Sequence, residues 1–381
     1  MSPSSRCARR LALVGAALGL ALLLWGFSVG PRALLAAGRT ALLLPDVLVF
    51  QPLRPSTSWT LPPSARSFNW TVRGESERGD LYLPALARRS PAVIVVLGVY
   101  PAPLDDPAVR RLGDGLARTG LVVLVPESPR LRAGHIVPEE VDVLVGAFEA
   151  LRRQPEVDPG RVGFLGLSVG GGLALLAAAD ERIAPDVAFV QTVGGFADAR
   201  DVLRQIGSAT TLEPGRPTWQ PSDLAIVAYR RQLIDAVPVP SDRDALEAAY
   251  LSADPIPVES GRQSPAGQLV QRLIEERDPA TVDSLIGDLP VEALARLHRL
   301  SPLERVGAIR APVFIMHDVN DPFVPVSESR RLAAALGERA HFREYQLFAH
   351  VVPSGGPNLL LLAREVAALA GQINAWYLLV G

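Results

Sequence analysis

The stretch that decides the fold reads Arg161-Val-Gly-Phe-Leu-Gly166-Leu-Ser168-Val-Gly170-Gly171-Gly172. Residues 161–165 are typical of a buried strand, and residues 169–179 form an apolar run with the length of a helix. Between them lies G-x-S-x-G, a pattern in which small residues leave room for a sharp turn from strand to helix. We therefore expect Ser168 on a strained turn, with its hydroxyl projecting above the strand ends. The alternative is a glycine-rich turn that carries a spectator serine.

Strand-like and helix-like segments alternate on both sides of this turn. We expect two short antiparallel strands at 67–72 and 80–84, further strands at 92–97, 121–125, 186–192, 313–316 and 342–347, and helices at 107–119, 138–153 and 358–380. Runs of β-branched residues between helices predict an α/β fold, with a mostly parallel sheet covered by helices on both faces.

One interval interrupts this alternation. No convincing strand pattern occurs between residues 195 and 311, and the interval is far too long for a plain loop. We expect a helical cap or lid at 196–304, inserted between a first core part at 66–195 and a second core part at 305–381. Its helical stretches are predicted at 222–236, 242–252, 267–276 and 291–300.

Composition excludes several kinds of chemistry. The 381 residues include 38 basic and 40 acidic side chains, giving a net charge of −2, and every basic side chain is arginine. Without lysine there is no phosphate-binding loop lysine and no Schiff base. The single cysteine excludes an intramolecular disulfide. Five arginines and no acid lie in the first 40 residues, so the body is mildly acidic, which argues against a nucleic-acid partner.

The N-terminal segment is typical of a membrane anchor. Residues 11–30 read LALVGAALGLALLLWGFSVG, an uncharged run that would span about 30 Å as a helix, and Arg6, Arg9 and Arg10 precede it. We expect a signal anchor at 1–30 and a single-pass membrane protein with an extracytoplasmic body. The alternatives are a cleaved signal with secretion of the body, or a buried core helix. Residues 31–65 are expected to form an apolar juxtamembrane segment and a linker, lying on the membrane or packed on the body.

The sequence resembles the α/β-hydrolase superfamily, most closely its dienelactone hydrolase and prolyl-oligopeptidase-like branches. The matching text is Glu156-Val-Asp-Pro-Gly-Arg161 followed by the G-x-S-x-G turn, an upstream helix-to-strand stretch at 111–126, and an acid and a histidine segment. The resemblance covers roughly residues 66–195 and 305–375, and the helical interval and the N-terminus lie outside it.

The resemblance implies a catalytic triad in the chain order serine, acid, histidine. Ser168 is the implied nucleophile. The acid falls at Asp321 of Asp321-Pro-Phe-Val-Pro325, with Asp318 as the rival, and the base falls at His350, in a loop after the last strand. Of the other histidines after Ser168, His298 is expected on the surface and His341 in a structural position, and His317 ends a strand directly before the acid segment.

Backbone N–H groups would stabilise the oxyanion of such an enzyme. The N–H of Val169 follows the nucleophile, and a second donor is expected in the loop after the strand at 92–97, at Val99 or alternatively at Tyr100. No motif for a metal or a cofactor is present, so we expect neither.

Together these residues predict a membrane-anchored serine hydrolase that cleaves a carboxylic ester or thioester of a small or acyl substrate through an acyl-enzyme. The cap could supply an apolar pocket for an acyl chain. The alternatives are a non-catalytic binding protein on the same fold, and an acyltransferase or peptidase with the same triad.

Overall fold

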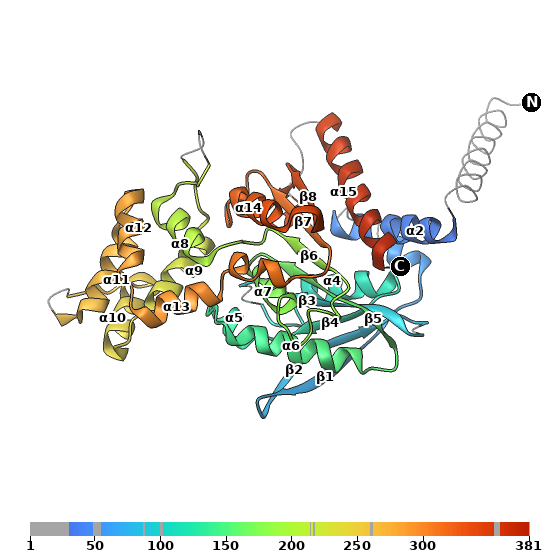
Figure 1. Ribbon diagram of the computed structural model, residues 1–381, viewed down its shortest axis with the longest axis horizontal. Helices are drawn as coiled ribbons and strands as arrows, with labels where there is room; N and C mark the ends of the chain where they lie inside the picture. Colours follow the sequence, from blue (N-terminus) through green and yellow to red (C-terminus); the bar gives the residue numbers. More distant parts are fainter. Residues whose placement is uncertain are drawn as a thin grey trace, which may run out of the picture.

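The computed structural model describes residues 30–48, 55–86, 88–99, 102–213, 215, 218–259, 262–353 and 359–380. An eight-stranded sheet with the order β1-β2-β4-β3-β5-β6-β7-β8 forms its centre (Figure 1). β1 pairs antiparallel with β2, β2 pairs antiparallel with β4, and the remaining neighbours run parallel. The strands are β1 Ser64–Val72, β2 Glu75–Leu83, β3 Ser90–Val96, β4 Val122–Pro126, β5 Val157–Leu167, β6 Val190–Val193, β7 Val313–Asp318 and β8 Ala340–Tyr345, and a small hairpin follows from β9 Phe348–Ala349 and β10 Val352–Pro353.

Helices cover both faces of the sheet, as the sequence predicts. On one face α6, α7 and α14 pack on side chains such as Ile94 and Phe164. On the other face α2, α4 and α15 pack on side chains such as Val95 and Leu165. Because successive residues of a strand point to opposite faces, the alternate residues of β3 and β5 serve the two cores. The helices are α2 Pro31–Val47, α4 Pro107–Arg118, α6 Glu139–Arg152, α7 Val169–Ala178, α14 Val326–Leu336 and α15 Leu359–Val380, with the short helices α3 Pro55–Trp59 and α5 Pro129–Arg132.

The described residues of the interval between β6 and β7 form helices joined by loops, with no strand, and they have a core of their own. The four predicted helices are present, and α8 and α12 are two more that the sequence did not predict. Figure 1 shows these helices at the opposite end of the molecule from α2 and α15. They are α8 Ala199–Ser208, α9 Asp223–Ile234, α10 Pro240–Tyr250, α11 Pro265–Glu275, α12 Pro279–Gly287 and α13 Val291–Arg299, followed by short 3-10 turns at η2 Pro302–Glu304 and η3 Val306–Ala308.

The segment before β1 packs on the body. Ala36 and Leu43 of α2 are buried in the same core as α4 and α15. Residues 11–29 of the predicted anchor lie outside the described residues, and in the described part of the chain no helix combines the length and the apolar character needed to cross a membrane.

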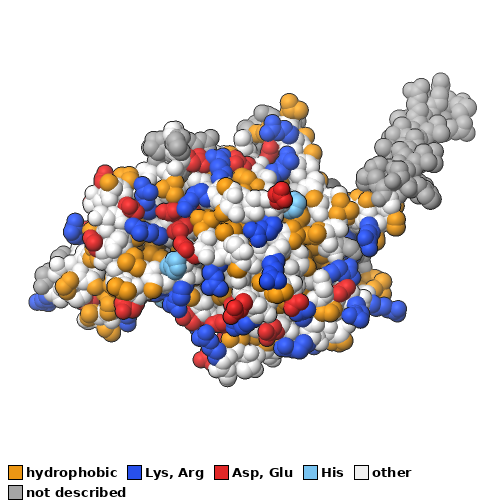
Figure 2. All heavy atoms as spheres, viewed as in Figure 1, with side chains coloured by type: hydrophobic (Ala, Val, Ile, Leu, Met, Phe, Trp, Pro, Cys, Tyr) orange, Lys and Arg blue, Asp and Glu red, His pale blue; other side chains and the backbone are white. Residues whose placement is uncertain are grey.

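Charge is well mixed on the surface shown in Figure 2, where arginine and acidic side chains lie interspersed. Several of these side chains form ion pairs, such as Arg152 with Asp186 at 2.7 Å. Exposed pairs of this kind contribute little to stability, so the apolar cores on the two faces of the sheet and in the insertion are the main source of the fold's stability.

Candidate active site

The turn at Ser168 has the strained geometry that the sequence predicts. Ser168 directly follows β5, has a φ of 56°, and is the N-terminal cap residue of α7. A Cβ atom added at Gly166 would lie 2.4 Å from the carbonyl oxygen of Gly170, and one added at Gly170 would lie 2.1 Å from that of Val96. Both distances are far below van der Waals contact, so the turn requires glycine on both sides of the serine. Strain of this kind concentrates at functional sites.

His350 and Asp321 form a buried pair. The imidazole Nδ1 lies 2.6 Å from Oδ2 of Asp321, and both side chains are almost fully buried. Because Nδ1 faces a carboxylate it carries the proton, which leaves Nε2 with a free lone pair in the neutral ring. Nε2 is buried and has no hydrogen-bond partner in the described part of the chain. A base that accepts a proton needs this arrangement.

Asp321 is held as an anion. Its Oδ1 accepts hydrogen bonds from the backbone N–H of Phe323 at 2.7 Å and of Val324 at 3.1 Å. Burial alone would raise the pKa of Asp321, but hydrogen bonds and charge from His317 and His350 outweigh burial and hold that pKa well below its usual range. Asp321 therefore stays ionised and can stabilise an imidazolium at His350.

His317 contacts the carboxylate of Asp321 and helps to hold it in position, a role that the sequence did not reveal. Its Nε2 lies 3.3 Å from Oδ2 of Asp321 and 2.8 Å from the carbonyl oxygen of Val324, and its Nδ1 lies 2.7 Å from the hydroxyl of Ser329. Since Nε2 faces two oxygen acceptors, it carries the ring proton. His317 is thus a structural histidine that fixes the carboxylate.

The rival acid occupies a different place. Asp318 accepts hydrogen bonds from the backbone N–H of Asn320 and of Phe348, each at 2.9 Å. Asp318 thereby links β9 to the loop between β7 and α14, which carries Asp321 and is called the acid loop below. Asp318 makes no hydrogen bond to His350. The geometry therefore selects Asp321 as the partner of the histidine.

Ser168 and His350 both lie at the carboxyl ends of the parallel strands, where Gly194 and Gly98 leave room for their side chains. The N–H of Ser168 donates to the carbonyl oxygen of Val193 at 2.8 Å, and the next residue, Gly194, lies under the imidazole. A Cβ atom added at Gly194 would be 2.7 Å from Nδ1 of His350. A Cβ atom added at Gly98 would be 3.2 Å from Oγ of Ser168. Nε2 of His350 is not hydrogen-bonded to Oγ of Ser168, and such contacts often tighten only when substrate binds.

Donors for an oxyanion lie beside Ser168. Val169 is the first residue of α7, and the N–H groups of a helix's first turn have no partner within the helix. Val99 lines the same pocket as Ser168, which keeps it a candidate for the second donor. Tyr100, the alternative, lies outside the described residues.

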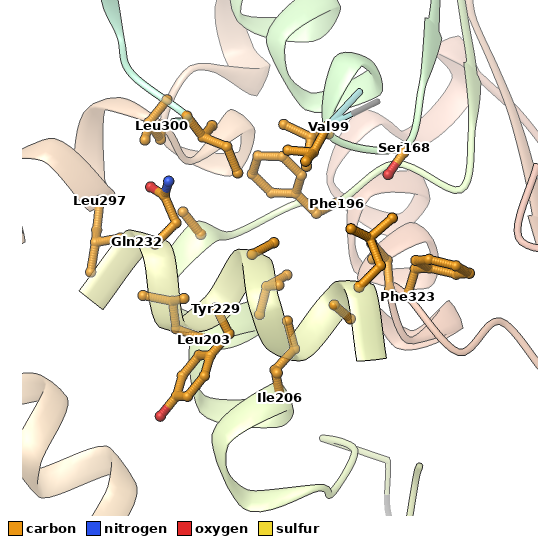
Figure 3. Close-up of a pocket in the computed structure, with 18 residues that line it drawn as sticks. Val99, Ser168, Phe196, Leu203, Ile206, Tyr229, Gln232, Leu297, Leu300 and Phe323 are labelled. Atoms are coloured by element: carbon orange, nitrogen blue, oxygen red, sulfur yellow. The ribbon is translucent and has the colours of Figure 1, made fainter. Parts of the chain in front are cut away.

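Ser168 opens onto an apolar pocket of about 90 Å³ between the sheet edge and the helical insertion (Figure 3). Among the residues that the structure describes, no arginine, aspartate, glutamate or histidine lines it. Its two large polar side chains form hydrogen bonds outside the pocket. The hydroxyl of Tyr229 donates to the carbonyl oxygen of Leu273 at 2.9 Å, and the side-chain amide N–H of Gln232 donates to the carbonyl oxygen of Gly134 at 3.2 Å. The insertion supplies most of the wall, from Phe196, Ala199, Val202, Leu203, Ile206, Leu224, Ala225, Ala228, Tyr229, Gln232, Leu297 and Leu300.

The insertion is fastened to the acid loop. The indole N–H of Trp219 donates to the carbonyl oxygen of Asp321 at 2.8 Å. Glu328, fully buried in α14, accepts from the backbone N–H of Ala197 at 3.1 Å and of Asp198 at 2.9 Å, where the insertion begins. Phe323 stacks on the imidazole of His350 with ring centroids 4.5 Å apart. Sequence reasoning missed Trp219, Glu328 and Phe323, because their partners are distant along the chain.

A second, larger apolar cavity of about 640 Å³ lies on the other face of the sheet, between the strands and α2, α4 and α15. Leu167 and Phe348 line it, but neither Ser168 nor His350 does. The pocket next to the nucleophile is therefore the one in Figure 3. In the same described ranges, no cluster of three histidine, cysteine, aspartate or glutamate side chains is placed to hold a metal ion.

Comparisons with known proteins give matches among solved structures. No protein-family model and no curated protein matches the chain. It is similar to puromycin hydrolase, with a TM-score of 0.50 and 15% identity over 86% of this chain and 40% of that one. It is also similar to Pyrococcus horikoshii acylaminoacyl peptidase, with a TM-score of 0.48 and 13% identity over 84% of this chain and 42% of that one. A third match is dienelactone hydrolase from Anabaena variabilis, with a TM-score of 0.45 and 16% identity over 83% of this chain and 97% of that one. The chain spans between 36% and 42% of the length of the peptidase structures matched first.

Proposed function

We propose that this chain, which has the α/β-hydrolase fold that its sequence resembles, is a serine hydrolase that cleaves carboxylic esters or thioesters of apolar acyl groups. One observation carries the proposal. A serine on a strained turn opens onto an apolar pocket. At the same edge of the sheet lies a buried histidine whose Nδ1 is 2.6 Å from an ionised aspartate and whose Nε2 has no hydrogen-bond partner among the described residues. A purely structural histidine would have both ring nitrogens engaged, as His317 has.

The mechanism follows from the roles of these groups. Oγ of Ser168 attacks the carbonyl carbon while Nε2 of His350 takes the hydroxyl proton, and Asp321 stabilises the resulting imidazolium. The N–H groups of Val169 and Val99 stabilise the negative charge on the carbonyl oxygen. The tetrahedral intermediate then expels the alcohol or thiol, which receives the proton from His350. Water, deprotonated by the same imidazole, attacks the acyl-enzyme, releases the acid and restores Ser168.

The pocket supports an acyl substrate over a peptide. A peptidase that recognises the free end of a peptide binds a charged terminus, whereas no described residue that lines this pocket is charged. An apolar wall binds a hydrocarbon chain through burial of its surface. An acyltransferase would use the same first half-reaction and pass the acyl group to an acceptor other than water.

We further propose that residues 1–30 anchor the enzyme in a membrane with its body on the extracytoplasmic side. The support is the uncharged run at 11–30 and the three arginines that precede it. Proteolysis of intact cells tests the side: an extracytoplasmic body is degraded by added protease, whereas a cytoplasmic body is protected.

Labelling with a fluorophosphonate probe tests the catalytic proposal. The probe reacts only with an activated serine, so the wild-type protein is expected to be labelled and Ser168→Ala is not. Ser284→Ala, which removes an exposed serine of α12, is the matched control and should label as the wild type does. Equal labelling of Ser168→Ala and the wild type would show that Ser168 is not the nucleophile.

A further inference from the structure

Helices α2 and α15 pack against each other at one end of the molecule (Figure 1). The guanidinium of Arg39 lies over the ring of Tyr377, 5.9 Å from its centroid, and this contact joins the two helices. The hydroxyl of Tyr377 in turn donates to the hydroxyl oxygen of Thr119 at 2.8 Å, next to α4. The inward faces of α2 and α15 are thus fixed to the body, so their outward faces are held in place as well.

The outward faces of both helices are apolar. Leu35 is 59% exposed, and Leu378 and Leu379 are 46% and 47% exposed. Apart from Arg32 and Arg364, each exposed position on the two helices is apolar or glycine, and none is acidic. These positions are Pro31, Leu34, Leu35, Gly38 and Ala41 on α2, and Leu360, Ala363, Ala367, Gly371, Ala375, Leu378 and Leu379 on α15. We call these positions, with Arg32 and Arg364, the α2–α15 surface.

This pattern differs from that of an ordinary surface helix. The exposed positions of α11 include Gln268, Arg272 and Glu275, as expected where a helix faces water. A contiguous exposed apolar face marks an interaction site in a stable protein. A helix whose exposed face is apolar and carries arginine as its only charged residue is suited to the boundary between lipid headgroups and acyl chains.

The chain upstream indicates which partner covers this surface. The uncharged run of residues 11–30 ends directly before Pro31, the first residue of α2. No linker separates the proposed anchor from α2, so α2 begins where the anchor leaves the bilayer. The first acidic residue of the whole chain is Asp46, at the far end of α2. A negatively charged bilayer would therefore meet no repelling carboxylate over the preceding residues.

We propose that the α2–α15 surface lies in the membrane interface, with its leucines at the acyl boundary and Arg32 and Arg364 at the lipid phosphates. The inference rests on the proposed anchor and goes beyond it, because it makes the enzyme's body a monolayer-bound unit of fixed orientation. A body on a flexible tether would leave this surface in water. Two membrane signals in series also give more stable attachment than one.

Site-specific fluorescence in the full-length chain tests the proposal. In a Cys7→Ser background, single cysteines replace Leu35, Leu378 and, as the matched control, Val291, an apolar residue of α13 that is 76% exposed. Each is labelled with nitrobenzoxadiazole, and the protein is reconstituted in phosphatidylcholine–phosphatidylglycerol vesicles with or without acyl-chain spin-labelled lipid. We expect at least twofold quenching by the spin label at positions 35 and 378 and none at position 291. Quenching at 35 and 378 no greater than at 291 would overturn the proposal.

A wash of the same vesicles at alkaline pH tests the anchor separately. Retention of the protein with unquenched labels at 35 and 378 would refute the α2–α15 surface and leave the anchor standing. Release of the protein would refute the anchor, while the quenching measured before the wash still decides the surface. Fluorophosphonate labelling of Ser168 in each variant reports the catalytic part of the proposed function independently, and it also shows that each variant is folded.

Discussion

Gly194→Ala tests how closely the site depends on the position of the imidazole. The added Cβ atom would lie 2.7 Å from Nδ1 and 2.8 Å from Cε1 of His350, and 3.1 Å from Oδ2 of Asp321. Ordinary contact begins near 3.4 Å, so the ring must move by about 0.7 Å. Displacements approaching 1 Å reduce rates by about 10²-fold, which sets the expected loss in kcat/KM. The loss stays below the roughly 10⁴-fold effect of removing the acid's role entirely.

Gly337→Ala is the matched control, because Gly337 has nearly the same φ, +59° against +62°, with no atom within 4 Å of an added Cβ. Both substitutions force alanine to a positive φ, which costs about 1–3 kcal/mol. The usual free energy of unfolding is about 5–15 kcal/mol, so both variants are expected to stay folded. We expect similar decreases in Tm for the two variants, but a loss in the hydrolysis of p-nitrophenyl esters and in fluorophosphonate reactivity only for Gly194→Ala. A Gly194→Ala enzyme within threefold of Gly337→Ala in both assays would refute the assigned geometry.

Three further predictions separate the roles of other residues. Asp321→Asn is expected to lower kcat/KM by about 10⁴-fold. Asp318→Asn weakens only loop hydrogen bonds, so it should lower Tm but change kcat/KM less than tenfold. Equal losses of kcat/KM in the two variants would contradict the choice of Asp321 as the acid. Ala228→Phe narrows the pocket, so it should reduce kcat/KM at least tenfold for octanoate esters and less than threefold for acetate esters. Ala295→Phe, on the exposed side of α13, should change kcat/KM for neither ester. An equal loss of kcat/KM for both esters in Ala228→Phe would place the acyl group elsewhere. The pKa of Asp321 is depressed in the folded state, so the ionised carboxylate stabilises the fold at pH values above its ordinary pKa of 3.8, and this stability is lost as the pH falls. The difference in unfolding free energy between the wild type and Asp321→Asn should therefore narrow from pH 5 to pH 2. A constant difference in urea titrations would contradict the depressed pKa.

The parts of the fold that follow local patterns could be predicted from the sequence. Apolar β-branched runs marked β3, β4 and β5, and the glycine pattern marked the turn at Ser168. The predicted strand at 186–192 begins only at Val190, since Asp186 still lies in a turn, although Ala188 and Phe189 already hydrogen-bond to β5. Helix α8 was missed although Asp198 accepts from the N–H of Asp201 and caps it, which is a readable signal.

The rest of the site depends on contacts that no local pattern contains. Gly194 has a positive φ and lies under His350, but its sequence neighbourhood resembles any glycine turn. Trp219 and Glu328 join the insertion to the acid loop across more than a hundred residues. The pairing of His350 with Asp321, by contrast, was expected from the resemblance, and the two side chains meet at 2.6 Å.

The most direct test of the central claim is to trap the acyl-enzyme. The wild-type protein is mixed with an excess of a p-nitrophenyl acyl ester and quenched in acid within the first turnover, and its peptides are analysed by mass spectrometry. The account predicts a burst of nitrophenol equal to the enzyme concentration and an acyl group on Ser168, with neither in Ser168→Ala. Ester hydrolysis that persists in Ser168→Ala, or an acyl group found on another residue, would contradict it.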